Sequence, residues 1–174
     1  MLKKHFWITN FVFFQAIWFA CAFVQGLAIP IASILLISHA FVTPTLKNDI
    51  YIAIFALIVG SLLDVALIHL DFIAFKNQAS HVPIWLALLW CYFGTTYNHA
   101  LGWLKQLPFY FVFVFGAVLG PSSYFAAGQI GVFEYKSHDL PLLLIHILSW
   151  GVLNLVFVKL SIFIDEFLPQ KATH

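Results

Sequence analysis

The sequence contains no arginine, and only 9% of its 174 residues are charged. Soluble domains carry about 25% charged residues, so this composition excludes a water-soluble fold. Arginine is also the side chain that binds phosphate groups in a bidentate manner, so a site of that kind is excluded as well. The lysines are scattered along the chain and form no basic patch, so we expect no nucleic acid partner.

Cysteine is scarce too, and the short motifs of familiar enzymes are missing. Cys21 and Cys91 both lie inside apolar runs and form no CxxC pair, so neither a redox motif nor a zinc ribbon is present. The sequence has no HxxHH, GxSxG or HExxH motif and no P-loop. His69, His99 and His146 have different predicted depths in the membrane, which disfavours a scattered metal site. We therefore expect no bound metal and no cofactor.

Apolar residues dominate what remains, at 63% of the chain. A membrane-spanning helix needs about 20 apolar residues at a rise of about 1.5 Å per residue. The first apolar run is too long for one span, and Gln25-Gly26 with Pro30 soon after supplies a break. The sequence predicts an all-α helix bundle that forms a single integral membrane domain over residues 1–174. Its six transmembrane helices are expected at about 6–25, 27–43, 50–70, 82–104, 107–127 and 140–164.

The fifth expected helix contains the segment Gly120-Pro121-Ser122-Ser123-Tyr124. Proline lacks an N–H and clashes with the preceding turn, so we expect this helix to be broken at Gly120-Pro121. Either the break exposes backbone to a ligand, or Gly116 and Gly120 let a neighbouring helix pack closely. No internal repeat is evident in the sequence, so an inverted-repeat transporter is not indicated.

The distribution of lysines predicts the orientation of the bundle. Cytoplasmic loops of membrane proteins are enriched in lysine. If the N-terminus is inside, the lysines fall on the cytoplasmic side in six cases and on the outside in two. The cytoplasmic ones are Lys3, Lys4, Lys47, Lys105, Lys159 and Lys171, and the outer ones are Lys76 and Lys136. Both termini are therefore expected in the cytoplasm.

This topology predicts that the loop at residues 72–81 lies on the outer side of the membrane. A reporter that is active only in the cytoplasm should be inactive when it is fused at Asn77, and active when it is fused at the C-terminus. Activity at Asn77 would overturn the orientation.

Polar side chains inside a bilayer are costly, and here the rise per residue sorts them into two layers. The upper layer contains Asp64, the only carboxylate well inside a predicted span, at about 21 Å from the inner boundary. His146 comes out at about the same height. Ser122, Ser123 and Tyr124 lie just above. We take these five residues as the candidates for catalytic roles.

Asp64 has no lysine at its depth, so it must be protonated or paired with His146. We predict that these two side chains are neighbours that face the bundle interior. Such a pair either shuttles protons or acts as general acid and base on a substrate held by Ser122, Ser123 or Tyr124. The alternative is a hydrogen bond between Asp64 and a serine or tyrosine hydroxyl that only holds helices together.

A second polar layer lies near the cytoplasmic boundary. It contains Asn10, Asn98, His99 and Asn154, all within about 4–9 Å of that boundary. The helix expected at about 6–25 adds Gln15 and Trp18, on positions that adjoin Asn10. The candidates for substrate binding are Gln15, Trp18, Asn98 and His99, although a histidine in such a layer is more often a hydrogen-bonding residue than a ligand.

With these residues in view, the chain resembles an uncharacterised bacterial inner-membrane family, domain of unknown function 2878. The matching positions extend over nearly the whole chain. They are Asn10-Phe11, Gln15, Trp18, Gly60, Asp64, Pro83-x-Trp85, Leu89-Trp90, Thr95, Trp103, Gly120 to Tyr124, Gly128 and Trp150. The resemblance implies an inner-membrane location and a fold. Because genes of this family often lie near genes for acyl-lipid modification, it also favours lipid metabolism, but it carries over no catalytic residues.

Three functions therefore stay open. The first is a membrane-embedded component of acyl-lipid metabolism, enzymatic or accessory, with Asp64, His146 and the segment 120–124 lining its site. The second is a proton-linked carrier or channel in which Asp64 titrates. The third is a structural subunit whose polar layers only hold helices together. The expected partners are membrane lipids, with a second membrane protein or a second copy of the chain as further possibilities.

Overall fold

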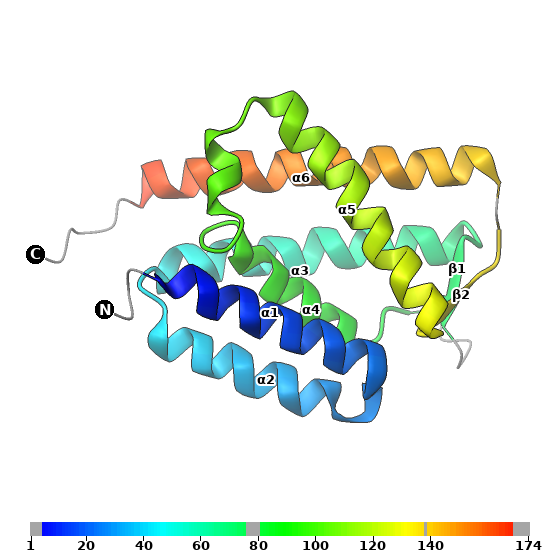
Figure 1. Ribbon diagram of the computed structural model, residues 1–174, viewed down its shortest axis with the longest axis horizontal. Helices are drawn as coiled ribbons and strands as arrows, with labels where there is room; N and C mark the ends of the chain where they lie inside the picture. Colours follow the sequence, from blue (N-terminus) through cyan, green and yellow to red (C-terminus); the bar gives the residue numbers. More distant parts are fainter. Residues whose placement is uncertain (1–4, 76–80, 138, 169–174) are drawn as a thin grey trace, which may run out of the picture.

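The computed structural model describes residues 5–75, 81–137 and 139–168, and within them six α-helices form one bundle (Figure 1). The helices are α1 (Phe6–Phe23), α2 (Gln25–Val42), α3 (Leu46–His69), α4 (Ile84–Thr96), α5 (Phe109–Ile130) and α6 (Leu140–Phe167). Two short strands, β1 (Ile73–Phe75) and β2 (Phe133–Tyr135), pair at one end, which we call the sheet end. The predicted all-α bundle is confirmed.

The outer surface of the bundle is apolar. Large hydrophobic side chains such as Phe41, Leu62 and Phe125 are well exposed. Soluble monomers rarely expose apolar patches of such extent, whereas a bilayer requires them. Within the described residues, five helices are long and apolar enough to cross a membrane, all except α4. The chain is thus a multi-pass membrane protein.

The fourth helix is much shorter than the range 82–104 that we expected. It ends at Thr96, and turns lead from there into a 3-10 helix over Gly102–Gln106. The hydroxyls of Thr95 and Thr96 donate hydrogen bonds to carbonyls three residues earlier, at 2.7 and 2.6 Å. Such local bonds compete with the helical pattern. Beyond these threonines, Asn98 and His99 contact Asp49 on α3. Side-chain contacts, and not a glycine or a proline, therefore end α4 at Thr96.

The expected break in the fifth helix is wrong. One continuous helix, α5, runs through Pro121 to Ile130. Proline removes only one backbone hydrogen bond, and membrane helices tolerate this where serine or threonine adds another. The carbonyl that Pro121 leaves without its helical donor is that of Ala117, and the Ser122 hydroxyl adds a bond to the adjacent Val118 carbonyl at 2.6 Å. The helix is continuous past the proline.

Helices α3 and α5 end in the same way, with a residue of positive φ that reverses the chain. After α3 this residue is Asp71 (φ 52°), and after α5 it is Gly131 (φ 85°). In both cases the next N–H bonds back to a carbonyl five residues earlier, from Phe72 to Leu67 and from Val132 to Ala127. This is the Schellman motif, and it directs each chain into a strand.

The units α3–β1–α4 and α5–β2–α6 are two copies of one arrangement, so our expectation of no internal repeat is wrong. Corresponding residues lie sixty positions apart, as in Gly60 and Gly120 or Trp90 and Trp150. The antiparallel strands pair with Ala74 opposite Glu134, which are again corresponding positions. Figure 1 shows α3 and α5 running toward the sheet end and α4 and α6 running away from it. The repeat is therefore parallel, with its axis along the bundle.

Two stacked tryptophans occupy the centre of this repeat. The rings of Trp90 and Trp150 are 5.3 Å apart between centroids and inclined by 21°. Each lies against a glycine of the preceding helix, Trp90 against Gly60 and Trp150 against Gly120. Gly116 likewise lies against the side chain of Asn154 on α6. The close packing expected at Gly116 and Gly120 is thus confirmed, with α6 as the neighbouring helix.

The bundle ends also bear on the predicted orientation. The end opposite the sheet holds the start of α1, the end of α2, the start of α3 and the end of α6 (Figure 1). The first and last helices thus begin and end on the same side, as our topology requires. Of the residues used to orient the bundle, Lys3, Lys4, Lys76 and Lys171, together with Asn77, lie outside the described residues.

The tryptophan–glycine contacts predict that a single methyl group at Gly60 is destabilising. A Cβ atom at Gly60 would lie 2.0 Å from the Trp90 ring, so Gly60→Ala forces the ring and its stacked partner to move. We expect a loss of about 1–3 kcal/mol, seen as a lower melting temperature in detergent. Gly26→Ala is the matched control, because nothing lies within 4 Å of its Cβ position. Equal melting temperatures for the two variants would contradict this packing.

Candidate functional site

Asp64 lies at the centre of the upper polar layer and is completely buried. Its carboxylate accepts a hydrogen bond from the Trp90 indole N–H at 2.6 Å and another from the Tyr124 hydroxyl. Asp64 and Tyr124 are corresponding residues of the repeat, so this contact crosses the axis beside the tryptophan stack. Among the ion pairs of the described residues none involves Asp64. The carboxylate is therefore held by two neutral donors from α4 and α5.

His146 joins this group through Tyr124 rather than through Asp64. Its ring lies 4.9 Å from the Tyr124 ring and 5.4 Å from the Phe72 ring, between centroids. Neither of its ring nitrogens has a hydrogen-bond partner among the residues that the structure describes, although the side chain is buried. Among the described residues no hydrogen bond joins His146 to Asp64, and Tyr124 lies between them. The bond from the Tyr124 hydroxyl to Asp64 is the helix-linking contact that we had considered as the alternative. Depth along the axis placed all three residues in one layer, but it did not specify which of them pair.

A cavity of about 510 Å³ lies beside this group, between α1, α4, α5 and α6. Its walls are mostly apolar and aromatic. Trp90, Tyr124 and Trp150 form part of the wall, whereas Asp64 and His146 do not reach it. Tyr124 thus contacts the cavity on one side and donates to the buried carboxylate on the other.

Four further predicted residues line this cavity. Gln15 and Trp18 come from α1, and Ser122 and Ser123 come from α5. The Trp18 indole N–H donates to the Ser123 hydroxyl at 2.9 Å and so joins the two helices across the cavity. The structure therefore brings residues predicted for substrate binding and for catalysis to a single space.

The cavity opens toward the lipid-facing surface. Two of its lining residues, Phe11 on α1 and Leu119 on α5, are about half exposed, at 49% and 50%. The repeat relates α3 to α5 and α6 to α4. Helix α3 packs directly on α6, whereas the corresponding pair, α5 and α4, makes almost no direct contact. The space between them is the cavity, with α1 on its other side. The departure from two-fold symmetry is thus what creates the cavity.

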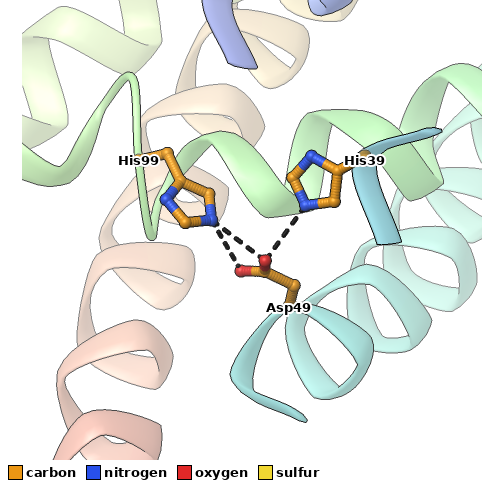
Figure 2. A group of neighbouring side chains, drawn as sticks. All are labelled: His39, Asp49 and His99. Atoms are coloured by element: carbon orange, nitrogen blue, oxygen red, sulfur yellow. Dashed lines mark hydrogen bonds and ion pairs between the residues drawn. The ribbon is translucent and has the colours of Figure 1, made fainter. Parts of the chain in front are cut away.

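Asn98 and His99 take part in a second cluster with Asp49, at the end of the bundle opposite the sheet, where α2 ends and α3 begins (Figure 1). The Nε2 atom of His99 lies 2.9 and 3.0 Å from the two carboxylate oxygens of Asp49. The Nε2 atom of His39 lies 3.0 Å from one of the same oxygens, and Asn98 donates to the other at 2.8 Å. Figure 2 shows both imidazole rings turned toward the one carboxylate.

The sequence did not identify His39 and Asp49 as site residues. Asp49 falls just before the helix that we expected at about 50–70, but it lies in the first turn of α3, and His39 lies in the last turn of α2. A short turn joins α2 to α3 and brings a residue at the end of one helix close to a residue at the start of the next. That spacing in the sequence could have predicted the contact between His39 and Asp49. His69 lies at the other end of α3, where Nδ1 bonds the Val65 carbonyl, so it is far along the helix from this cluster.

The remaining residues of the lower layer are hydrogen-bonded within the bundle. Asn10 donates to Thr95 at 3.0 Å, joining α1 to α4. Asn154 accepts from the Tyr97 hydroxyl and donates to the Val112 carbonyl, both at 2.5 Å. These contacts link helices, which is the packing role that we had considered for such residues.

The double role of Tyr124 predicts a measurable loss when its hydroxyl is removed. Tyr124→Phe leaves the buried Asp64 carboxylate with Trp90 as its only donor, which should cost about 1–3 kcal/mol. We expect a lower melting temperature in detergent than for Tyr110→Phe, a control in which an exposed tyrosine loses the same atom. If both variants melted with the wild type, the Tyr124–Asp64 contact would contribute nothing to the fold.

Comparison with known proteins supports the family resemblance seen in the sequence. No curated protein and no solved structure matches the chain. One family model, described as "Protein of unknown function (DUF2878)", matches residues 7–156. This range begins in α1, ends within α6, and includes the tryptophan stack and every residue that lines the cavity. The chain therefore belongs to the DUF2878 family.

Proposed function

We propose that this protein binds an acyl chain in the cavity between α1, α4, α5 and α6, and that it acts in acyl-lipid metabolism. The observation that carries the proposal is the cavity itself, with its apolar wall and its opening on the lipid-facing surface. Its volume of about 510 Å³ lies in the range of small-molecule sites. Each methylene group that leaves water for such a wall contributes about 0.8 kcal/mol, although a lipid entering from the bilayer gains much less.

The polar groups of the cavity support the binding of a lipid with a polar end. Ser122 and Ser123 lie on α5, one turn after Leu119, and Gln15 faces the same space from α1. Tyr124 stands behind them with its hydroxyl on Asp64. Ser122 already donates to the Val118 carbonyl, whereas the Ser123 hydroxyl accepts from Trp18 and keeps its own proton to donate. A carbonyl or ester placed among these residues would meet the Ser123 and Gln15 donors while its chain lies among the aromatic side chains. Asp64 does not reach the cavity, so Tyr124, which lines the wall and donates to Asp64, is the residue through which the carboxylate would influence that group.

A proton-linked carrier is the second function to compare, because Asp64 is the expected titrating group. Such a carrier needs a route for water to the carboxylate. Both carboxylate oxygens are instead bonded to Trp90 and Tyr124, and the side chain has no exposed surface. The enclosed carboxylate beside an open apolar cavity favours the lipid function over the carrier.

The proposed location is the bacterial inner membrane, with both termini in the cytoplasm. Lysine positions support this orientation: Lys47 is at the start of α3 and Lys105 is in the 3-10 helix, both toward the end opposite the sheet. Lys105 pairs there with Asp165 at 2.7 Å. The His39–Asp49–His99 cluster would then lie near the cytoplasmic surface.

The proposal predicts a change in membrane lipids when the gene is removed. Lipid extracts of the deletion strain should differ from the wild type in the abundance of at least one acyl-lipid species, and expression of the intact chain should restore it. Lipid profiling by mass spectrometry measures this. Identical profiles under several growth conditions would contradict a role in acyl-lipid metabolism.

A matched pair of variants tests the cavity directly. Leu119→Trp adds bulk at the opening of the cavity, whereas Val118→Trp adds the same side chain to the neighbouring exposed position, which does not line it. We expect the first variant to lower crosslinking by a photoreactive fatty acid about tenfold, equivalent to about 1.4 kcal/mol, and the second to leave it unchanged. Equal crosslinking in both variants would place the lipid elsewhere.

A further inference from the structure

We propose that His39, Asp49 and His99 bind one divalent first-row transition metal ion, in a site separate from the lipid cavity. The three residues come from the end of α2, the start of α3 and the turn after α4. One ligand atom from each lies within 4.8 Å of the other two. Such a site would tie the turn after α4 to the junction of α2 and α3.

The distances between the ligand atoms fit a metal site. Bonds of about 2.0–2.1 Å from a zinc ion place tetrahedral ligand atoms about 3.3 Å apart. Here Nε2 of His39 lies 3.0 Å from the Asp49 carboxylate, and Nε2 of His99 lies 2.9 Å from it. All three ligand atoms lie within 4.8 Å of one another, so a shared ion requires them to shift from hydrogen-bond contact with the carboxylate to contact with the ion.

The same geometry argues against a catalytic triad. A serine- or threonine-type triad needs the hydroxyl and the carboxylate on opposite nitrogens of one imidazole. Thr43 and the Asp49 carboxylate both contact Nε2 of His99, at 3.3 and 2.9 Å. A proton relay from Thr43 through His99 to Asp49 is therefore not arranged. Both Nε2 atoms instead lie against one carboxylate, so two imidazole nitrogens and a carboxylate oxygen are available to one ion.

The surrounding residues provide the outer contacts that metal sites need. A metal-binding histidine usually donates its other ring N–H to a polar group. Nδ1 of His39 lies 3.2 Å from the Tyr92 hydroxyl, so it can donate there when Nε2 binds the ion. Asn98 and Thr45 contact the same Asp49 oxygen, at 2.8 and 3.2 Å, which fixes the carboxylate.

Burial and charge also favour a cation. The three side chains are at most 5% exposed, and the Phe6 ring lies 5.2 Å from the His39 ring and 4.7 Å from the His99 ring. Within the part of the chain that the structure describes, Asp49 pairs with His39 and His99, whereas lysine pairs only with Asp165 and Glu134. A divalent ion bound by two neutral imidazoles would supply positive charge beside this carboxylate.

The ligand set indicates the class of metal. Two imidazoles and one carboxylate suit zinc, iron and their neighbours, whereas magnesium and calcium prefer sites made entirely of oxygen. Thr43, Thr45 or a water molecule is available to complete the coordination. The residues that flank the turn of His99, Tyr97 and Ala100, line the lipid cavity, so a bound ion would also hold one end of that cavity in place.

Titration with cobalt(II) tests this site in the full chain. We strip the purified protein in detergent with a chelator, add Co²⁺, and record the visible spectrum. We expect about one ion per chain, with the strong absorption of a low-coordinate cobalt site, and displacement by Zn²⁺. If the wild-type protein shows no such absorption, and elemental analysis after loading with zinc shows no bound metal, the proposal is overturned and the cluster is a hydrogen-bond network only.

Variants assign the ion to these residues. His39→Gln and Asp49→Asn should abolish the cobalt spectrum, whereas His69→Gln, at the other end of α3, should leave it unchanged. Tyr92→Phe keeps every ligand and removes only the hydroxyl beside His39, so it should weaken binding by about 10–100-fold. Wild-type binding by His39→Gln and Asp49→Asn would overturn the assignment. Because neither residue lines the lipid cavity, failure here leaves the lipid proposal untouched.

Discussion

The stacked pair Trp90 and Trp150 is the contact on which the rest of the bundle depends. Each ring fits only because the facing residue is a glycine, Gly60 or Gly120, and a Cβ atom at either glycine would lie 2.0 Å from the ring. The stack therefore fixes the distance of α3 from α4 and of α5 from α6. It also lies on the axis that relates the two units, beside the hydrogen bond from Tyr124 to Asp64.

The cavity lies where the two units of the repeat differ in their contacts. If the two units were equivalent in every contact, α4 would pack on α5 as α6 packs on α3, and the cavity would be closed. Instead α4 is short and packs against α1 and α2, which leaves room between α4 and α5. The early end of α4 has a second consequence, because the turn beyond it carries His99 to Asp49. One shortened helix thus accounts for both the cavity and the second polar cluster.

The sequence predicted the features that depend on depth in the membrane. It did not predict the features that depend on how each helix is rotated about its axis and which side chains meet. Hydropathy located the helices because the bilayer demands about 20 apolar residues per span. The rise per residue placed Asp64, Tyr124 and His146 in one layer for the same reason. The end of α4, the pairing of Asp64 with Tyr124 and the approach of His39 to Asp49 depend on side-chain contacts between helices. The repeat was missed because few residues besides Gly60, Gly120, Trp90 and Trp150 coincide at the sixty-residue offset.

The central claim is that the space between α1, α4, α5 and α6 is built to hold a lipid chain. The most direct test is a structure of the protein determined by electron cryo-microscopy in bilayer nanodiscs made from native lipids. Our account requires an elongated, continuous density in the cavity, between Trp18 and Ser123 on one side and Trp90 on the other. A cavity that contains only ordered water, or that is closed by direct packing of α4 on α5, would contradict it.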